Sequence, residues 1–465
     1  MAFQFAQSMP SARLADAELG RVCARVLPSA LIRETLAEFG ALEQRSRKLP
    51  GELLVWLAIA ASLFPHEALE RVGFKLLRGL RLIWPRSDLS AATKGAICQA
   101  RYQLGAAPLA RLFRRVCRPL ATPDTPGAWL FGLRVVAIDG TTEAVPDTPA
   151  NARAFGRATN AQGLVGFPLL RAVLLIECGT HAVIDAGVWA YRVSEYVGAA
   201  RLLRSVQAGM LVLWDRGLQS AALIGAVRDR GAQVLGRVPR TVHLPVLQRL
   251  SDGSFLSRVT VSADRPRPTG RSWLVRVIEY TLTDPARPGC GERHRLVTTL
   301  LDPAQAPAVD LVVGYHERWE AELTLDEQDT HLRQARPLFR SGKPVGVLQE
   351  YYGMLRAHYL VRAVMADAAA TAPVPLDPRR LRFTLAVQLV TDAIPEFQLV
   401  DPSEHERRYA LLLADLRRDP LPARTGRQNP RVLRYRRRKY PPKRPRHIPW
   451  PQPTIPFRQS VQLLN

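Results

Sequence analysis

The sequence predicts an α/β fold in which a mixed sheet with flanking helices follows an all-helical N-terminal region. Apolar residues recur at three- and four-residue spacing up to about residue 122, whereas short apolar runs typical of buried strands begin near residue 129. Between about residues 241 and 301, β-branched runs alternate with Pro- and Gly-rich turns. We therefore expect five segments: 1–122, helical; 123–240, the first part of the core; 241–301, a β-rich insertion; 302–400, the second part of the core; and 401–465, a basic tail.

The N-terminal region carries three strongly periodic stretches: LLVWLAIAASLF, ALERVGFKLLRGLRLIW and LARLFRRVCRPL. A shorter helix is expected from Thr93 to Leu104, after a start rich in Ser and Asp. Lys94 and Arg101 on this helix are candidates to contact DNA, as residues of a recognition helix do. An ordinary solvated helix face is the alternative.

The first part of the core predicts a hairpin followed by a strand–helix–strand unit. LRVVAID is expected to be a strand that ends on Asp139, and MLVLWD a strand that ends on Asp215. Between them, FPLLRAVLLIECGTHAVIDAGVWAY reads as two strands around a Gly-Thr turn. Open α/β sheets place their sites at the carboxyl ends of strands, so both aspartates are candidate site residues.

In the second half of the chain, the sequence predicts two changes of architecture. The runs FLSRVTVSAD, SWLVRVIEYTL and HRLVTTLL are expected to form a small β-rich insertion that is not part of the parallel core. From Pro307 one helix is expected to run through LVVGYHERWEAELTLDEQDTHLRQ, and a second through PVGVLQEYYGMLRAHYLVRAVMADAAA.

The charge balance points to a polyanionic partner. The chain has 65 Lys and Arg against 41 Asp and Glu, a formal net charge of +24, which suits nucleic acid. Residues 417–446 hold thirteen Lys or Arg and one acid, and should bind phosphates electrostatically; the densest run is Arg436, Arg437, Arg438 and Lys439. Five widely spaced cysteines and the lack of a signal-like or membrane-spanning run predict a cytoplasmic protein with no membrane partner.

Carboxylates in so basic a chain suggest a metal site. Asp139 and Asp215 would repel each other at neighbouring strand ends unless a cation neutralised them. On the helix from Pro307, Tyr315, Arg318 and Glu322 lie within about a 60° sector. The simpler reading of that helix is an Arg318–Glu322 surface ion pair worth ~0.3–0.5 kcal/mol. In the sharper reading, Glu322 completes a site for two Mg²⁺ ions, with Mn²⁺ able to substitute, and catalyses phosphodiester chemistry.

At these residues the chain resembles the insertion sequence four family of DDE transposases. AIDGT is similar to the family's first catalytic Asp motif, LWDRG to the second, and YHERWEAE matches its Tyr-x2-Arg-x3-Glu signature. The segment from about Leu27 to Ala121 resembles the family's N-terminal helical domain. The resemblance implies a ribonuclease H-like core interrupted by a β-rich insertion, metal binding by Asp139, Asp215 and Glu322, and a grip on a DNA phosphate by Tyr315 and Arg318.

The resemblance also implies the partners and the reaction. A homodimer would hold terminal inverted repeats in a synapse and move the element to target DNA by cut-and-paste. The chain departs from the family at one position: where the family has a Lys seven residues after the Glu, this chain has Asp329. We expect Arg333, one turn further along the same face, to supply the missing charge; Lys343 or the basic tail are alternatives, as is a place for Asp329 among the metal ligands.

Two other readings stay open at this stage. One is a related nuclease that cuts DNA but does not join strands, and the other is a decayed or domesticated copy that only binds DNA. A Walker A loop, a Gly-x-Gly-x-x-Gly motif after a strand and a His-Glu-x-x-His motif are all missing from the sequence, which argues against nucleotide hydrolysis and a zinc site.

Overall fold

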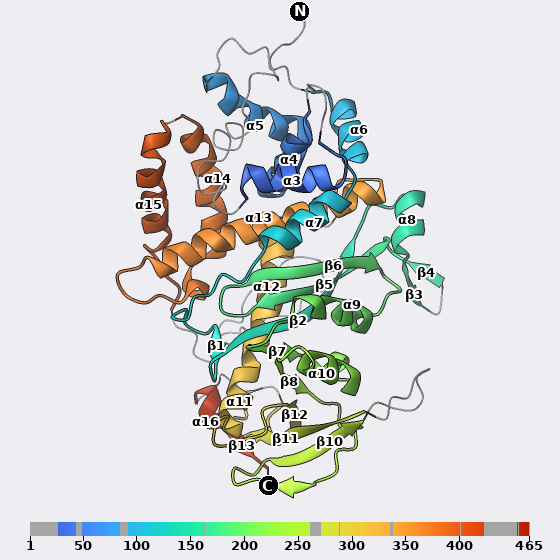
Figure 1. Ribbon diagram of the computed structural model, residues 1–465, viewed down its shortest axis with the longest axis vertical. Helices are drawn as coiled ribbons and strands as arrows, with labels where there is room; N and C mark the ends of the chain where they lie inside the picture. Colours follow the sequence, from blue (N-terminus) through green and yellow to red (C-terminus); the bar gives the residue numbers. More distant parts are fainter. Residues whose placement is uncertain are drawn as a thin grey trace, which may run out of the picture. The chain divides into compact units, whose positions relative to one another are not determined.

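A computed structural model describes residues 27–42, 49–83, 92–160, 163–260, 271–287, 289–334, 338–399, 401–422, 453 and 455–464 (Figure 1). The chain divides into two compact units, and each consists of three stretches of sequence. Unit 1 comprises Met1–Trp129, Val136–Ser205 and Trp319–Leu421. Unit 2 comprises Leu130–Val135, Val206–Arg318 and Pro422–Asn465.

The N-terminal part of unit 1 is helical, as the periodicity predicts. Its helices are α3 (Ser29–Glu38), α4 (Gly51–Leu63), α5 (Leu69–Ile83), α6 (Lys94–Leu104) and α7 (Ala107–Val116). Almost every residue of α4 is buried, because this helix is apolar on all faces and lies against the long α13 (Pro344–Ala370). Helices α14 (Phe383–Leu399) and α15 (His405–Leu416) also pack on α13, with the short η5 (Pro378–Arg380) and η6 (Pro402–Glu404) between them (Figure 1).

Unit 1 also holds an antiparallel sheet. Strand β5 (Leu169–Glu177) pairs with β6 (Ala182–Ala190) to form the predicted hairpin, and on its other edge with β2 (Leu133–Ala144). Helices α8 (Pro149–Phe155) and α9 (Glu195–Leu202) are capped by Thr148 and Ser194, whose hydroxyls accept from the third residue beyond. The remaining elements here are β1 (Trp129–Leu130), the hairpin of β3 (Ala158–Asn160) and β4 (Gly163–Val165), and η1 (Leu203–Ser205).

The prediction that a strand ends on Asp139 is wrong. Strand β2 continues to Ala144, and Asp139 lies in its middle opposite Leu174 of β5. The apolar run stops at Ile138, but backbone pairing with β5 does not depend on side-chain polarity. The strand therefore continues through residues that are mostly half-buried, with Thr142 exposed and Glu143 buried.

Unit 2 is built on a mixed sheet. Strand β7 (Met210–Trp214) is parallel to β8 (Gln233–Arg237), and α10 (Ala221–Arg228) connects them as predicted. The β-rich segment supplies β9 (Gln248–Arg249), β10 (Phe255–Thr260), β11 (Ser272–Leu282) and β12 (His294–Thr298). Strand β12 pairs antiparallel with β8, so these strands extend the mixed sheet without adding to its parallel pair.

The helix expected from Pro307 is interrupted twice. In unit 2, α11 (Ala308–Tyr315) leads into a 3₁₀ turn, η3 (His316–Arg318). In unit 1, α12 (Trp319–Asp326) leads into a π-helix, η4 (Glu327–Leu332). Both changes of helical pitch flank the segment that carries Glu322. Single π-turns of this kind are frequent at functional sites.

The C-terminal region is not simply a tail from residue 401. Residues up to Leu416 are helical in unit 1, and the last described residues fold onto unit 2 as α16 (Phe457–Ser460) and β13 (Val461–Leu463). Strand β13 pairs antiparallel with β11 through Tyr280–Leu463 and its neighbours. Arg458 forms an ion pair with Asp310 of α11. In the described part of the chain, no helix is long and apolar enough to cross a membrane.

Candidate active site and nucleic-acid interface

Asp139 is half-buried on β2 of unit 1. Its carboxylate accepts the Gly140 N–H at 2.9 Å. A Cβ at Gly140 would lie 2.7 Å from the carboxyl carbon of Glu195, so a larger residue here would displace this α9 side chain. Sequence reasoning missed Glu195 as a neighbour of the Asp139 segment. The glycine that follows the aspartate was the only signal of a close approach there.

Asp215 follows β7 directly in unit 2, as predicted. Its Oδ1 accepts the Gly217 N–H at 2.7 Å and so caps the short helix η2 (Arg216–Leu218). The preceding Trp214 is fully buried, whereas Asp215 itself is half-buried. The aspartate therefore stands at the point where an entirely buried strand reaches the surface.

Tyr315 and Arg318 lie beside Asp215 in unit 2. The Tyr315 hydroxyl donates to the carbonyl oxygen of Trp214 at 3.2 Å, which ties the end of α11 to the end of β7. Burial raises the pKa of Tyr315 to about 12, with the Asp215 carboxylate adding to the rise and Arg318 opposing it. Three residues predicted from motifs about 100 positions apart are thus gathered in one unit.

Glu322 is half-buried in the middle of α12, in unit 1. Asp139 belongs to the same unit, whereas Asp215 belongs to unit 2. Among the residues that the structure describes, no group of three or more His, Cys, Asp or Glu side chains is arranged to hold a metal ion. The donor chemistry of the three carboxylates nevertheless suits Mg²⁺, which prefers oxygen ligands.

Arg333 does not supply an exposed positive charge. Its guanidinium forms an ion pair with Glu143 of β2, and the two side chains are only 11% and 7% exposed. The same group lies over the Phe339 ring, 4.5 Å from its centroid. Asp329 lies 3.9 Å from Arg333, and burial together with the hydrogen bond to Glu143 raises the pKa of Asp329 to about 8. The expectation that Arg333 replaces the family's Lys at a phosphate is therefore corrected, because the buried Glu143 already neutralises its charge.

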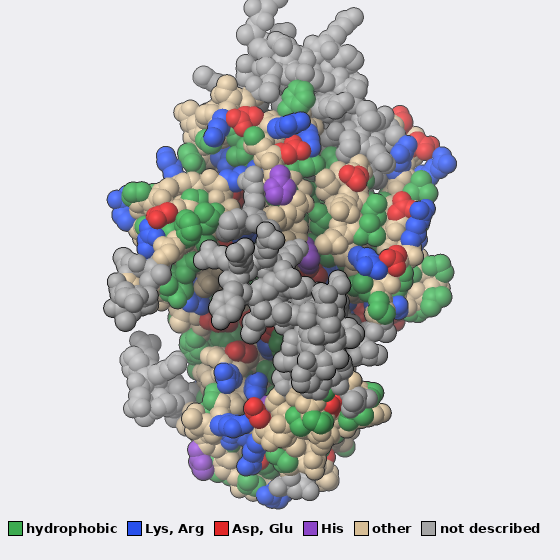
Figure 2. Space-filling model, turned by 180° about the vertical axis from the view of Figure 1, so that it is seen from behind, with side chains coloured by type: hydrophobic (Ala, Val, Ile, Leu, Met, Phe, Trp, Pro, Cys, Tyr) green, Lys and Arg blue, Asp and Glu red, His purple; other side chains and the backbone are tan. Residues whose placement is uncertain are grey.

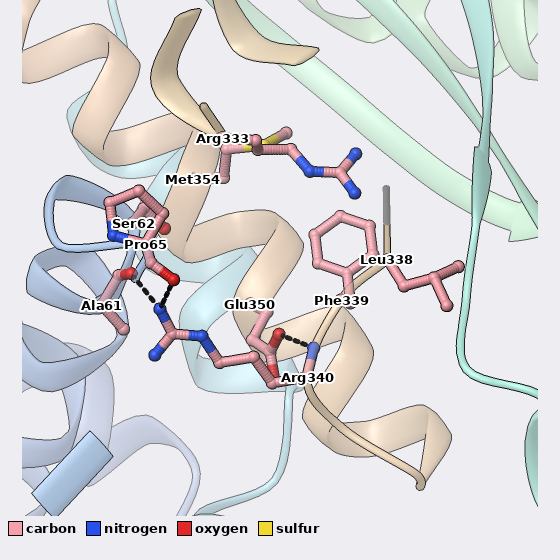
Figure 3. Close-up of a pocket in the computed structure, with 9 residues that line it drawn as sticks. All are labelled: Ala61, Ser62, Pro65, Arg333, Leu338, Phe339, Arg340, Glu350 and Met354. Carbon is pink, nitrogen blue, oxygen red and sulfur yellow. Dashed lines mark hydrogen bonds between the residues drawn. The ribbon is translucent and has the colours of Figure 1, made fainter. Parts of the chain in front are cut away.

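A small hollow of about 50 Å³ borders this cluster in unit 1 (Figure 3). In Figure 3, Arg340 reaches from the loop before α13 to the carbonyl oxygens of Ala61 and Pro65, to which it donates at 3.1 and 2.7 Å. The Arg340 N–H donates to Glu350 at 2.7 Å. The hollow is far smaller than the several hundred Å³ of typical ligand pockets. These contacts brace the loop against α4, and the hollow is not a nucleotide site.

Helix α6 presents only part of its predicted DNA-contacting face. Thr93 caps the helix by accepting the Ala96 N–H, and Lys94 next to it is exposed. Arg101 is 5% exposed and donates to the Gln349 side chain at 3.1 Å and to the Gly346 carbonyl at 3.3 Å. The expectation that Arg101 contacts DNA is therefore corrected, because this residue joins α6 to α13 inside unit 1.

Four of the predicted DNA-binding residues, Arg436, Arg437, Arg438 and Lys439, lie outside the described residues. On the face drawn in Figure 2, the described Lys and Arg side chains are interspersed with Asp and Glu. On that face, the described part of the chain therefore does not by itself form one continuous basic surface.

Comparison with known proteins covers both halves of the chain. Residues 17–114 match the family model "Insertion element 4 transposase N-terminal", and residues 130–345 match "Transposase DDE domain". The chain is 29% identical over 420 residues to "Transposase InsG for insertion sequence element IS4" of Escherichia coli (strain K12), covering 88% of this chain and 91% of that protein.

Two further matches cover less of a protein or are weaker. "Putative transposase InsZ" of the same organism is 28% identical over 207 residues, 44% of this chain and 66% of that protein. Among solved structures, the piggyBac transposase synaptic complex with hairpin DNA is 13% identical with a TM-score of 0.42, over 91% of this chain and 88% of that chain. A likeness at that score supports no conclusion here.

Proposed function

The chain belongs to the insertion element 4 family of DDE transposases, and on this basis we propose that it binds the terminal inverted repeats of an insertion sequence and catalyses metal-dependent strand cleavage and strand transfer. The relative named a transposase for insertion sequence element IS4 matches nearly its full length. The Transposase DDE domain match spans Asp139, Asp215 and Glu322, and such a domain implies a ribonuclease H-like fold.

The observation that carries the proposal is the grouping of Asp215, Tyr315 and Arg318 in unit 2. The Tyr315 hydroxyl donates its one proton to the Trp214 carbonyl, and its pKa of about 12 keeps that proton in place at neutral pH. To contact a phosphate, the O–H would turn from this carbonyl to the DNA. Arg318 brings a permanent positive charge to the same place. A hydrogen-bond donor and a cation beside a proposed metal ligand can orient a DNA phosphate and stabilise the negative charge that develops on it during cleavage.

Asp139, Asp215 and Glu322 are the residues that would hold divalent cations, Mg²⁺ or Mn²⁺. When bound, such ions would supply an activated water or 3′-hydroxyl and stabilise the leaving oxygen. The chain's own residues would orient the phosphate through Tyr315 and Arg318. In this proposal no covalent protein nucleophile is required, and the chain acts on DNA as a homodimer in the cytoplasm.

Lys343, and not Arg333, is our candidate for the positive charge that the family places seven residues after the Glu. Lys343 is exposed at the start of α13, with its Nζ 4.6 Å from the centroid of the Tyr102 ring. Exposed Lys94 of α6 and the run from Arg436 to Lys439 remain proposed DNA contacts. All of these would act mainly through phosphates and so give a salt-dependent affinity.

The test is Mg²⁺-dependent cleavage of labelled duplexes that carry the element's own ends. Asp215→Asn should bind these duplexes as the natural chain does but cleave at least about 10³-fold more slowly, because a metal ion contributes several kcal/mol to the transition state. Asp229→Asn is the matched control, since Asp229 is an exposed aspartate of the same unit paired with Arg271. Binding without cleavage by the natural chain would favour the DNA-binding relic, and cleavage without joining to target DNA would favour a nuclease.

A further inference from the structure

Five ionisable side chains form a buried cluster in unit 1, apart from the proposed metal ligands. They come from the turn between β5 and β6, from α12, from η4 and from α13, and none is more than 8% exposed: His181, Glu320, Glu327, His358 and Arg362. Ionisable groups are almost never buried this deeply unless they are paired. The contacts within the cluster therefore decide which elements are held together.

His181 bridges two glutamates. Its Nε2 lies 2.6 Å from Glu320 Oε2, and its Nδ1 lies 2.9 Å from Glu327 Oε1. On the other side, Arg362 Nε donates to Glu327 Oε2 at 2.9 Å, and His358 Nε2 lies 3.0 Å from the same oxygen. Burial disfavours the ionised form of Glu327, but Arg362 and His181 outweigh it and hold its pKa well below the usual range.

The backbone at His181 supports a constrained role. His181 has a φ of +58°, in the left-handed region that few residues other than glycine adopt. The hairpin turn itself holds this conformation, because the His181 N–H donates to the Glu177 carbonyl at 2.9 Å. The turn thus presents the imidazole to α12 and η4 in one fixed direction.

The two bridged glutamates lie on one face of the helix that carries Glu322. Glu320 and Glu327 are seven residues apart, so at about 100° per residue their directions differ by only about 20°. Glu322 is about 200° from Glu320 and faces the opposite side. The bridge joins the beginning of α12 to the first residue of η4, one on each side of Glu322 along the chain.

We propose that His181 is a positioning residue for Glu322: by bridging Glu320 and Glu327 it fixes the rotation of α12 about its axis, so that Glu322 faces away from the cluster toward the metal. The inference rests on the proposed function, in which Glu322 is a metal ligand. Groups that orient metal ligands without touching the metal typically change affinity by about 10- to 100-fold when they are removed.

The variant His181→Asn tests this role with little disturbance of the turn. Asparagine tolerates a positive φ better than most residues, but its side chain is too short to span both glutamates. We expect the Mg²⁺ concentration for half-maximal cleavage to rise about 10- to 100-fold, with a similar loss of Mn²⁺ affinity followed by electron paramagnetic resonance. Binding of the end duplex should be unchanged.

Three further variants of the full chain are compared with His181→Asn and the natural chain in both measurements. Glu322→Gln reports on the proposed ligand itself. His294→Asn is the matched control: His294 is a 9% exposed histidine of unit 2 whose ring contacts Arg237 and the Gly289 carbonyl. Glu320→Gln keeps the shape of one anchor while weakening the bridge, and it replaces His181→Asn if that variant does not fold.

The outcomes separate this inference from the proposed function. A weakened metal response in His181→Asn or Glu320→Gln, with His294→Asn unchanged, supports the positioning role. A natural metal response in the folded His181→Asn or Glu320→Gln chain, with Glu322→Gln inactive, overturns it and leaves the proposed function intact. If Glu322→Gln cleaves and binds Mn²⁺ like the natural chain, the assignment of Glu322 fails, and the positioning role fails with it.

Discussion

The variant Arg333→Ala tests directly whether Arg333 stabilises the fold or binds DNA. The substitution removes the cation that faces Glu143, whose side chain is 7% exposed, and the contact with the Phe339 ring. Asp329 next to them already holds a proton at neutral pH, because its pKa is about 8. One buried carboxylate, that of Glu143, is then left without a counter-ion.

The expected loss of stability follows from that burial. Breaking a buried pair by removing one partner costs about 3–5 kcal/mol, and we expect about 3 kcal/mol here because Glu143 can take up a proton. In the double variant Glu143→Gln/Arg333→Met no charge is left unpaired, so its stability should return to within about 1 kcal/mol of the natural chain.

Urea unfolding followed by tryptophan fluorescence measures both effects. The control is Arg111→Ala, which breaks an ion pair of the same unit with Glu38 whose side chains are 47% and 41% exposed; it should change stability by less than about 1 kcal/mol. Affinity for the end duplex is measured over a range of salt concentrations. A lost phosphate contact would lower the salt slope by about 1, and we expect no change for Arg333→Ala.

The reasoning is refuted if Arg333→Ala keeps its stability but binds DNA more weakly with a reduced salt slope. Arg333 would then contact phosphate, as the sequence alone led us to expect. An equal loss of stability in the single and double variants would show instead that packing, and not the charge pair, matters at this position.

Three further predictions follow from the same geometry. The folded chain keeps the Asp329 proton up to about pH 8, while the unfolded chain releases it near pH 4, so the stability of the fold falls as pH rises across that window. Asp329→Asn should therefore raise the free energy of unfolding by about 1 kcal/mol at pH 8.5, a small figure because 37% of the side chain is exposed. An equal gain at pH 4 would contradict this. Tyr315→Phe loses the bond to Trp214, worth about 1 kcal/mol; single-turnover cleavage should slow about fivefold, and an unchanged rate would argue against a positioning role for the hydroxyl. Deleting residues 455–465 uncovers the part of β11 that pairs with β13, so light scattering should reveal aggregation that the full chain does not show.

Much of the fold was predictable because hydrophobic periodicity is a local property of the chain. The helices of the N-terminal region, the β5–β6 hairpin, and the β7–α10–β8 unit all appear where apolar spacing placed them. The error at β2 lies where backbone pairing overrides side-chain pattern. This strand runs past Asp139 because it stays paired with β5.

For the candidate site, too, some features could be predicted from the sequence and others could not. The motifs around Asp139, Asp215 and Glu322 identified the family, because a transposase signature depends on residue types at short spacings. The fate of single basic residues was not predictable from such spacings. Lys94 and Arg101 belong to one helix, yet Lys94 is exposed and Arg101 is buried against α13, about 250 residues away in the sequence.

By itself, the sequence determined the family, the α/β class, the positions of most helices and strands, and the three acidic residues proposed to bind metal. Only the tertiary structure decided which charges are neutralised inside the protein. Arg333 is paired with Glu143, and His181 bridges Glu320 and Glu327, across sequence separations of 139 to 190 residues. An ion pair depends on distance and burial in space, and a linear pattern of residue types contains neither.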